Sequence, residues 1–142
     1  MAAEVFSEAW AQAWGEQMRG SSAYRGAAAK WEGAVVLVME ADAGLGVPVE
    51  RAVCADLWHG DCRRSGEASP AERAQAAVVL VAGARTWRDV LEGRTDPVVG
   101  LMSGALRLER GSIAALFPFT SAAREMVAAA RQVEASFPAG WR

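Results

Sequence analysis

The residues best suited to nucleophilic catalysis lie together in one short stretch of the chain. His59, the only histidine, is followed at once by Gly60, Asp61 and Cys62. A histidine beside a cysteine can promote the reactive thiolate form of the thiol. However, two such residues in the polar stretch 59–68, which predicts a loop, do not make a preorganised pocket. We therefore interpret His59 as a residue of a turn or a strand end.

Metal ligands and phosphate-binding loops are also poorly represented. One histidine and two cysteines, Cys54 and Cys62, do not match the spacing of a structural zinc site. The glycines of residues 93–104 fall at predicted helix ends and inside a helix, whereas a phosphate-binding loop lies between a strand and a helix start. Asp96 precedes Pro97, which favours a helix cap over a reactive carboxylate. The sequence thus predicts a protein that is not an enzyme and that uses no cofactor or metal.

Length, charge and hydrophobicity restrict the class of protein. The chain of 142 residues is long enough for one substantial core, so we expect a single domain spanning residues 1–142. The net charge of −2 and the dispersed arginines argue against a nucleic-acid partner, which requires a basic face. The longest apolar run, residues 76–84, has about half the length of a bilayer-spanning helix, and the N-terminus lacks the pattern of a secretory signal. These features predict a cytoplasmic protein.

The cysteine and arginine contents bear on the compartment and the source. The two cysteines fit a reducing compartment, where a disulfide is possible but not needed. Lys30 is the only lysine, and alanine is abundant. We interpret this composition as the mark of a GC-rich or heat-adapted bacterial genome, although arginine-for-lysine bias is an uneven marker of thermophily.

Residues 86–117 contain the elements that would position a binding site. Thr86, with Asp89 three positions later, has the pattern of a helix N-terminal cap. A short helix is therefore predicted over residues 87–92. Gly93 is placed to end it, because glycine enters the left-handed conformation without strain.

A second short helix and a strand are predicted directly afterwards. Asp96 and Pro97 begin the helix and Gly104 ends it. Leu106 and Leu108 then alternate with charged residues, as in a strand with one buried face. Because short helices are not stable alone, their apolar residues must pack against a larger element, and a sheet is the expected partner.

The chain is predicted to begin and end with helices. Phe6, Trp10 and Trp14 recur at helical spacing within residues 3–19, and we expect this face to pack on the sheet. A partner-binding or membrane-surface helix is the alternative. After Pro118, Thr120 or Ser121 can cap a final helix that ends at Pro138.

Three strands are predicted between these helices. They cover residues 34–40, 51–58 and 75–82, and the first two form a hairpin. Ser69, followed by Pro70, forms a capping box for one helical turn before the third strand. Strands joined by hairpins, with helices grouped outside them, indicate an antiparallel sheet with helices on one face.

The most specific motif of the chain is W-x-x-V-L-x-G-x-x-D-P, from Trp87 to Pro97, followed by G-x-L-x-L from Gly104 to Leu108. With the strand ending in Leu-Trp-His-Gly and the Ala-Ala-Val-Val-Leu-Val-Ala-Gly strand, this pattern resembles the sterol carrier protein 2 domain family over roughly residues 6–133. The resemblance implies an α+β fold with a five-stranded, mainly antiparallel sheet and helices packed on one face, enclosing an apolar cavity. It further implies a hydrophobic ligand in that cavity, such as a fatty acid, fatty acyl-CoA or phospholipid, with the C-terminal helix near the mouth.

The sequence therefore predicts an intracellular lipid carrier or transfer protein. Sterol is a weaker candidate ligand for a bacterial chain. The residues expected to line the ligand cavity are apolar, and most come from the stretch 86–117: Trp87, Val90, Leu91, Val98, Leu101, Met102, Leu106, Leu108, Ile113, Leu116, Phe117 and Met126.

Two other functions stay open at this stage. One is a non-enzymatic regulatory or protein-interaction module with a vestigial cavity, which a homodimer through the Trp10 and Trp14 helix would favour. The other is an accessory to an enzyme that acts on acylated substrates. The expected partners are a lipid or fatty acyl ligand, a membrane in transient contact and, as an alternative, a second copy of the chain.

Overall fold

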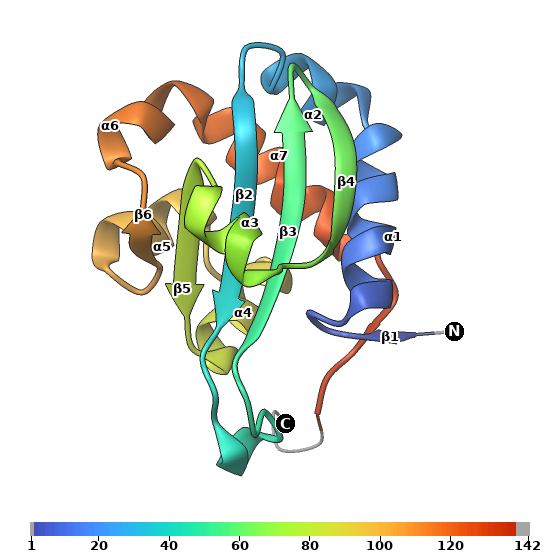
Figure 1. The fold of residues 1–142 in the computed structure, drawn as a ribbon, viewed down its shortest axis with the longest axis vertical. Coiled ribbons are helices and arrows are strands. Elements are labelled where there is room, and N and C mark those ends of the chain that lie inside the picture. The colour runs from blue at the N-terminus through green and yellow to red at the C-terminus, as the bar shows by residue number, and fades with distance from the viewer. Residues whose placement is uncertain (1, 139–142) are drawn as a thin grey trace.

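A five-stranded sheet forms the centre of the molecule in the computed structural model, which describes residues 2–138 (Figure 1). Its strands are β2 (Glu32–Met39), β3 (Arg51–Trp58), β4 (Asp61–Glu67), β5 (Val78–Ala82) and β6 (Arg107–Arg110). Two further strands, β1 (Ala3–Glu4) and β7 (Ala135–Ser136), pair with each other. The helices are α1 (Glu8–Arg19), α2 (Ser22–Ala27), α3 (Pro70–Gln75), α4 (Ala84–Leu91), α5 (Pro97–Ser103), α6 (Ile113–Leu116) and α7 (Thr120–Arg131), with short 3₁₀ turns η1 (Ala43–Leu45) and η2 (Phe117–Phe119).

The strand order in the sheet is β4-β3-β2-β5-β6, and only the β2–β5 pair is parallel. This topology confirms the predicted α+β fold with a mainly antiparallel sheet. The parallel pair arises because the chain leaves β4 at one edge and returns through α3 to the far side of β2. A crossover connection of this kind is what joins parallel strands.

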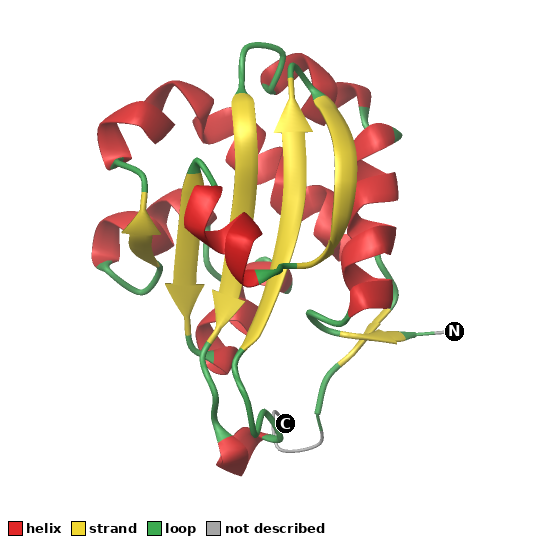
Figure 2. Ribbon diagram, in the orientation of Figure 1, coloured by secondary structure: helices red, strands yellow, loops and turns green. Residues whose placement is uncertain are grey.

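The two faces of the sheet are covered unequally (Figure 2). The main core lies between one face and a helical layer, in which α7 contacts α1, α2, α4 and α5. The opposite face carries α3 and a small cluster of Val36, Val38, Cys54, Ala76 and Val79. Most of the apolar burial is therefore on the side that carries the helical layer, and the other side keeps only a small satellite core.

The stretch predicted as a polar loop, residues 59–68, is instead mostly the strand β4, so that prediction was wrong. His59 and Gly60 form a two-residue hairpin turn with positive φ angles of 50° and 85°, the conformation that hairpins with a right-handed twist favour. Cys62 and Gly66 are buried, Ser65 is half-buried, and the other residues of the strand are exposed. The strand escaped prediction because an edge strand keeps most of its side chains in water and so carries few apolar residues.

Helix α1 covers the inner face of β4 at close range. A β-carbon at Gly15 would lie only 2.0 Å from the Ser65 side-chain oxygen, so only glycine permits this approach. Glu8 accepts a hydrogen bond from the backbone N–H of Glu67 at 3.0 Å. Trp10 and Trp14 are 1% and 2% exposed, which confirms that this helix face packs into the core.

Helix caps were predicted with mixed success. Asp96 accepts hydrogen bonds from the N–H groups of Val98 and Val99, and Gly104 ends α5 in the left-handed conformation, both as predicted. Ser69 forms the predicted capping box of α3. The prediction for Thr86 was wrong, because it lies inside α4, whose N-cap is Gly83.

Several element boundaries also differ from the predictions, three of them by more than two residues. The first helix begins at Glu8, because residues 3–4 form β1 and pair with β7. The third strand begins at Val78, because α3 extends to Gln75. The last helix starts without a side-chain cap and ends at Arg131, well before Pro138.

No helix among residues 2–138 is long and apolar enough to cross a bilayer.

Candidate functional site

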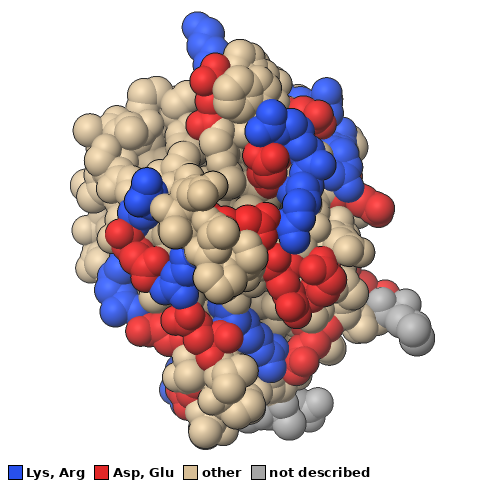
Figure 3. Space-filling view, viewed as in Figure 1, with Lys and Arg blue, Asp and Glu red and all other residues tan. Residues whose placement is uncertain are grey.

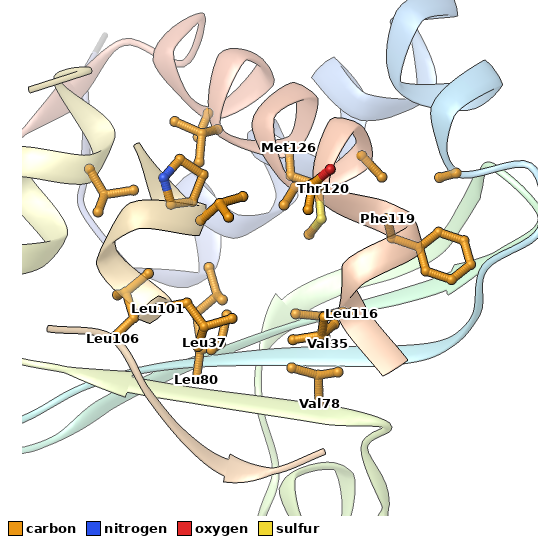
Figure 4. A pocket seen from close by; sticks show the side chains of 18 of the residues that line it. Val35, Leu37, Val78, Leu80, Leu101, Leu106, Leu116, Phe119, Thr120 and Met126 are labelled. Atoms are coloured by element: carbon orange, nitrogen blue, oxygen red, sulfur yellow. The ribbon is translucent and has the colours of Figure 1, made fainter. Parts of the chain in front are cut away.

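An apolar cavity of about 130 Å³ lies between the sheet and the helical layer (Figure 4). Its sheet side is formed by Val35 and Leu37 of β2 and by Val78 and Leu80 of β5. Val35 is the register partner of Val78, and Leu37 is the register partner of Leu80. Side chains two positions apart on a strand share a face, so the parallel pairing places these four residues in one apolar surface.

The helical side of the cavity comes from the stretch that the sequence singled out. Figure 4 shows Leu101 of α5 and Leu106 at one end, close to Leu37 and Leu80. It shows Leu116 at the other end, above Val35 and Val78. Helix α7 adds Met126 from above.

All but one of the residues predicted to line a cavity lie on its wall: Trp87, Val90, Leu91, Val98, Leu101, Met102, Leu106, Ile113, Leu116, Phe117 and Met126. The exception is Leu108, which is half-buried against the core. It is the register partner of Leu80 on the edge strand β6. Leu80 therefore stands between Leu108 and the rest of the cavity wall.

Helices α1 and α2 and the loop between α2 and β2 supply a part of the wall that sequence reasoning did not assign to the site. These residues are Trp10, Trp14, Tyr24, Ala28 and Trp31. The sequence predicted that Trp10 and Trp14 are buried. Their helical spacing, however, does not show whether a buried residue lines a cavity or belongs to the ordinary core. The period-two pattern of the strands could have identified the sheet residues, whereas the pairing of β2 with β5 had no sequence signal.

Three tryptophans of the wall have their indole N–H groups satisfied by backbone carbonyls. Trp14 Nε1 donates to the Met126 oxygen at 3.0 Å. Trp31 Nε1 donates to Gly33 at 2.9 Å, and Trp87 Nε1 donates to Val38 at 2.8 Å. These rings therefore present apolar faces to the cavity and are held in place at their polar edges.

An ion pair outside the cavity connects two elements of the helical layer. Arg124 of α7 donates to the Asp96 carboxylate at the start of α5, with 2.8 Å between Nε and Oδ2. The hydrogen bond from Arg124, followed by those from the Val98 and Val99 N–H groups, lowers the pKa of Asp96. Asp96 therefore caps α5 and also ties that helix to α7.

One side of the cavity opens beneath exposed apolar residues. Val99, Met102 and Phe117 are 60%, 61% and 59% exposed, and Ile113 is 40% exposed. We call these four residues of α5, α6 and η2 the portal patch. Met102, Ile113 and Phe117 also line the cavity. Figure 3 shows that the upper left edge of the molecule, over α6, carries no charged side chains in this view.

The His59 and Cys62 pair does not form a catalytic site. His59 Nε2 lies 2.7 Å from Glu32 Oε1 at the surface, and its ring stacks on Trp58. Cys62 is buried, and burial raises its pKa, which opposes the thiolate form. Burial likewise raises the pKa of Cys54 to about 12. Both cysteines are free thiols.

These features define an α+β protein whose apolar cavity lies between a mainly antiparallel sheet and a layer of short helices. No protein-family model matches the chain, and no curated protein matches it. Several solved structures, in contrast, match the chain. A crystal structure of sterol carrier protein 2 is 46% identical, with a TM-score of 0.85, and the match covers 92% of this chain and 99% of that chain.

Two further solved structures are similar. The solution structure of a conserved hypothetical protein from Thermus thermophilus, described as a possible sterol carrier protein, is 42% identical with a TM-score of 0.84. That match covers 96% of this chain and 97% of the other. The apo form of sterol carrier protein 2 from Yarrowia lipolytica shares the fold at 15% identity and a TM-score of 0.55, over 83% of this chain and 89% of that chain. The chain belongs to the sterol carrier protein 2 family.

Proposed function

We propose that this protein is a lipid carrier that binds the acyl chain of a fatty acid, fatty acyl-CoA or phospholipid in the cavity. The observation that carries the proposal is the composition of the cavity wall. Apart from the hydroxyl groups of Tyr24 and Thr120 and the indole N–H groups of the tryptophans, the side chains of the wall are apolar. Such a wall suits a hydrocarbon, and the names of the similar structures support a lipid as the ligand.

The free energy of binding would come from transfer of methylene groups out of water. Each buried methylene contributes about 0.8 kcal/mol, so roughly ten of them contribute about 8 kcal/mol before the entropic cost of association. No charged side chain is buried in the described part of the chain. Affinity would therefore depend on chain length and only weakly on ionic strength.

The size of the cavity favours a flexible ligand over a rigid one. An engineered cavity of about 150 Å³ holds a benzene molecule, and sites for larger ligands measure about 300–1,000 Å³. A cavity of about 130 Å³ must therefore widen to hold a long chain. An acyl chain can enter one methylene at a time as the walls separate, whereas a fused-ring sterol needs most of its volume at once.

The segment that moves to admit the ligand is residues 111–119, which hold α6 and η2. None of the residues of these two elements is buried. Helix α7 is held more firmly, because its Met126 carbonyl accepts the Trp14 indole N–H and α1, α2, α4 and α5 all contact it. Elements with few buried contacts open at the lowest free-energy cost.

The portal patch would bring this opening to a membrane for a short time. Exposed apolar residues beside a cavity mouth are typical of sites that contact lipid or another protein. The nearby cations Arg124 and Arg107 are paired with Asp96 and Glu40. Contact would therefore rest on apolar insertion, and anionic lipids would add little to it.

Native mass spectrometry of the purified protein tests the proposal. A carrier should retain a lipid whose mass identifies it as a fatty acid, fatty acyl-CoA or phospholipid, bound one per chain. A protein that is empty, and that stays empty after incubation with hexadecanoic acid, would contradict the carrier function.

A further inference from the structure

The hydroxyl group of Tyr24 is an exception among the polar groups of the cavity wall. Tyr24 lies on α2 and is 1% exposed. Among the described residues, the hydroxyl oxygen of Tyr24 is the one buried side-chain polar atom that has no hydrogen-bond partner. A buried hydroxyl without a partner is costly, and native proteins rarely contain one without a reason.

The surroundings of Tyr24 show that the missing partner is not a general feature of this wall. The neighbouring wall residues Trp14, Trp31 and Trp87 all donate to backbone carbonyls. The backbone N–H of Tyr24 is also satisfied, because it donates to the Ser21 hydroxyl at 3.1 Å. Within the described part of the wall, the side-chain hydroxyl of Tyr24 is the buried group left unpaired, and Tyr24 is one of the residues that line the cavity.

The hydroxyl group of Tyr24 acts as a hydrogen-bond donor. Burial, and then the nearby Cys62 and Asp61 side chains, raise the pKa of Tyr24. The group therefore keeps its proton throughout the physiological pH range. It can donate a hydrogen bond to an acceptor that enters the cavity.

We propose that Tyr24 determines ligand specificity by donating a hydrogen bond to an uncharged oxygen atom of the bound lipid. The inference rests on the proposed carrier function and adds to it the chemistry of one ligand atom. A carboxylate at this point is disfavoured, because none of the described cations is buried to compensate it and Asp61 lies on the same side. A hydroxyl, ketone or ester carbonyl satisfies Tyr24 without that cost.

The position of Tyr24 indicates which part of the lipid carries this oxygen. Tyr24 lies near Cys62 and Asp61 of β4, which is the edge strand opposite β6. Figure 1 shows α5 and α6, which carry most of the portal patch, on the β6 side. A lipid whose charged head group stays at the portal would reach Tyr24 with the far part of its chain. A fatty acid with a hydroxyl group at its distal end fits this arrangement.

Displacement of a fluorescent fatty acid by 16-hydroxyhexadecanoic acid and by hexadecanoic acid tests the inference. The wild-type protein should prefer the hydroxylated acid over the unsubstituted one. In Tyr24→Phe, affinity for the hydroxylated acid should fall about three- to tenfold, while affinity for hexadecanoic acid stays the same. Thr86→Val, which removes a hydroxyl outside the cavity wall, should keep the wild-type preference.

Thermal unfolding of the ligand-free variant separates this role from a structural one. Tyr24→Phe removes an unpaired buried oxygen and keeps the ring, so its melting temperature should equal or exceed that of the wild type. A lower melting temperature, with both acids bound as in the wild type, would show a structural hydroxyl and overturn the inference while leaving the carrier function intact. Failure of both acids to bind the wild type would overturn the carrier function and this inference together.

Discussion

At the scale of single residues, Asp96 has the best-defined structural role in the helical layer. Its carboxylate caps α5 through the N–H groups of Val98 and Val99 and accepts a hydrogen bond from Arg124 on α7. These contacts lower its pKa below the ordinary aspartate value. The carboxylate must therefore be ionised for the contacts to contribute fully to the stability of the layer.

Replacing Asp96 by alanine should lower the free energy of unfolding by about 1–2 kcal/mol at pH 7. Because the folded-state pKa is depressed, this contribution is fully present above the unfolded-state pKa of about 4 and is lost as the pH falls through the folded-state value. Urea unfolding of the wild type and Asp96→Ala should thus show a difference at pH 7 that shrinks toward about pH 2.5. Asp42→Ala, at the N-cap of a 3₁₀ turn where the aspartate makes no side-chain cap hydrogen bond, is the matched control.

The aspartate and threonine caps show what the sequence could and could not reveal at this scale. Asp96 was predictable because proline at the next position and Gly104 at the other end define the same helix. Thr86 was misassigned because the true N-cap, Gly83, has no side chain and therefore leaves no polar signal. The partnerless hydroxyl of Tyr24 depends on long-range packing, and no local pattern predicts it.

At the scale of secondary-structure elements, α5 and the α6–η2 segment combine two roles. They line the cavity, and three of their lining residues, Met102, Ile113 and Phe117, are also exposed in the portal patch. Val99 belongs to the patch but not to the cavity wall, so it allows membrane contact to be tested apart from ligand binding.

Val99→Glu should weaken binding to phosphatidylcholine vesicles about tenfold and slow lipid transfer between vesicles, because a charge would have to enter the lipid interface. Near the N-terminus of α5 the added carboxylate is compatible with the helix dipole, so the fold should be retained. Val49→Glu is the matched control, since Val49 is 67% exposed and lies outside both the patch and the cavity wall. Equal vesicle binding by the two variants would contradict membrane contact through the portal patch.

Strand β4 is an element that the local sequence pattern could not identify. A register shift between Asp56 and Leu57 breaks its alternation, and its exposed residues include the consecutive Arg63 and Arg64, which pair with Asp56 and Glu72. Local composition therefore resembles a loop. The strand is stabilised by pairing with β3 and by α1 packed over its inner face, neither of which is local in sequence.

At the scale of the whole molecule, the sheet and the helical layer meet around a space that their side chains only partly fill. The sequence predicted the α+β class and most of the helical wall, because amphipathic patterns show which faces are buried. It did not predict the parallel pairing of β2 with β5, which forms the sheet side of the cavity. A cavity is a property of how two layers meet, and its volume follows from packing geometry that periodicity does not encode.

Ligand binding should stabilise the molecule as a whole, because a chain in the cavity joins the two layers. At a free ligand concentration about 100 times the dissociation constant, the expected gain is about 2.7 kcal/mol. Scanning calorimetry with hexadecanoic acid should therefore show a melting temperature raised by several degrees. An unchanged melting temperature at high ligand concentration would show that the acid does not bind the folded protein in preference to the unfolded chain.

The most direct test of the account is titration of Leu101→Trp with a fluorescent fatty acid. Leu101 lies on the cavity wall close to Leu37 and Leu80 (Figure 4), so an indole there should fill space that the chain would occupy. Val49→Trp adds the same ring outside the cavity and should bind like the wild type. The account predicts at least a tenfold loss of affinity in a Leu101→Trp variant that keeps the wild-type circular dichroism spectrum, and unchanged affinity in that folded variant would contradict it.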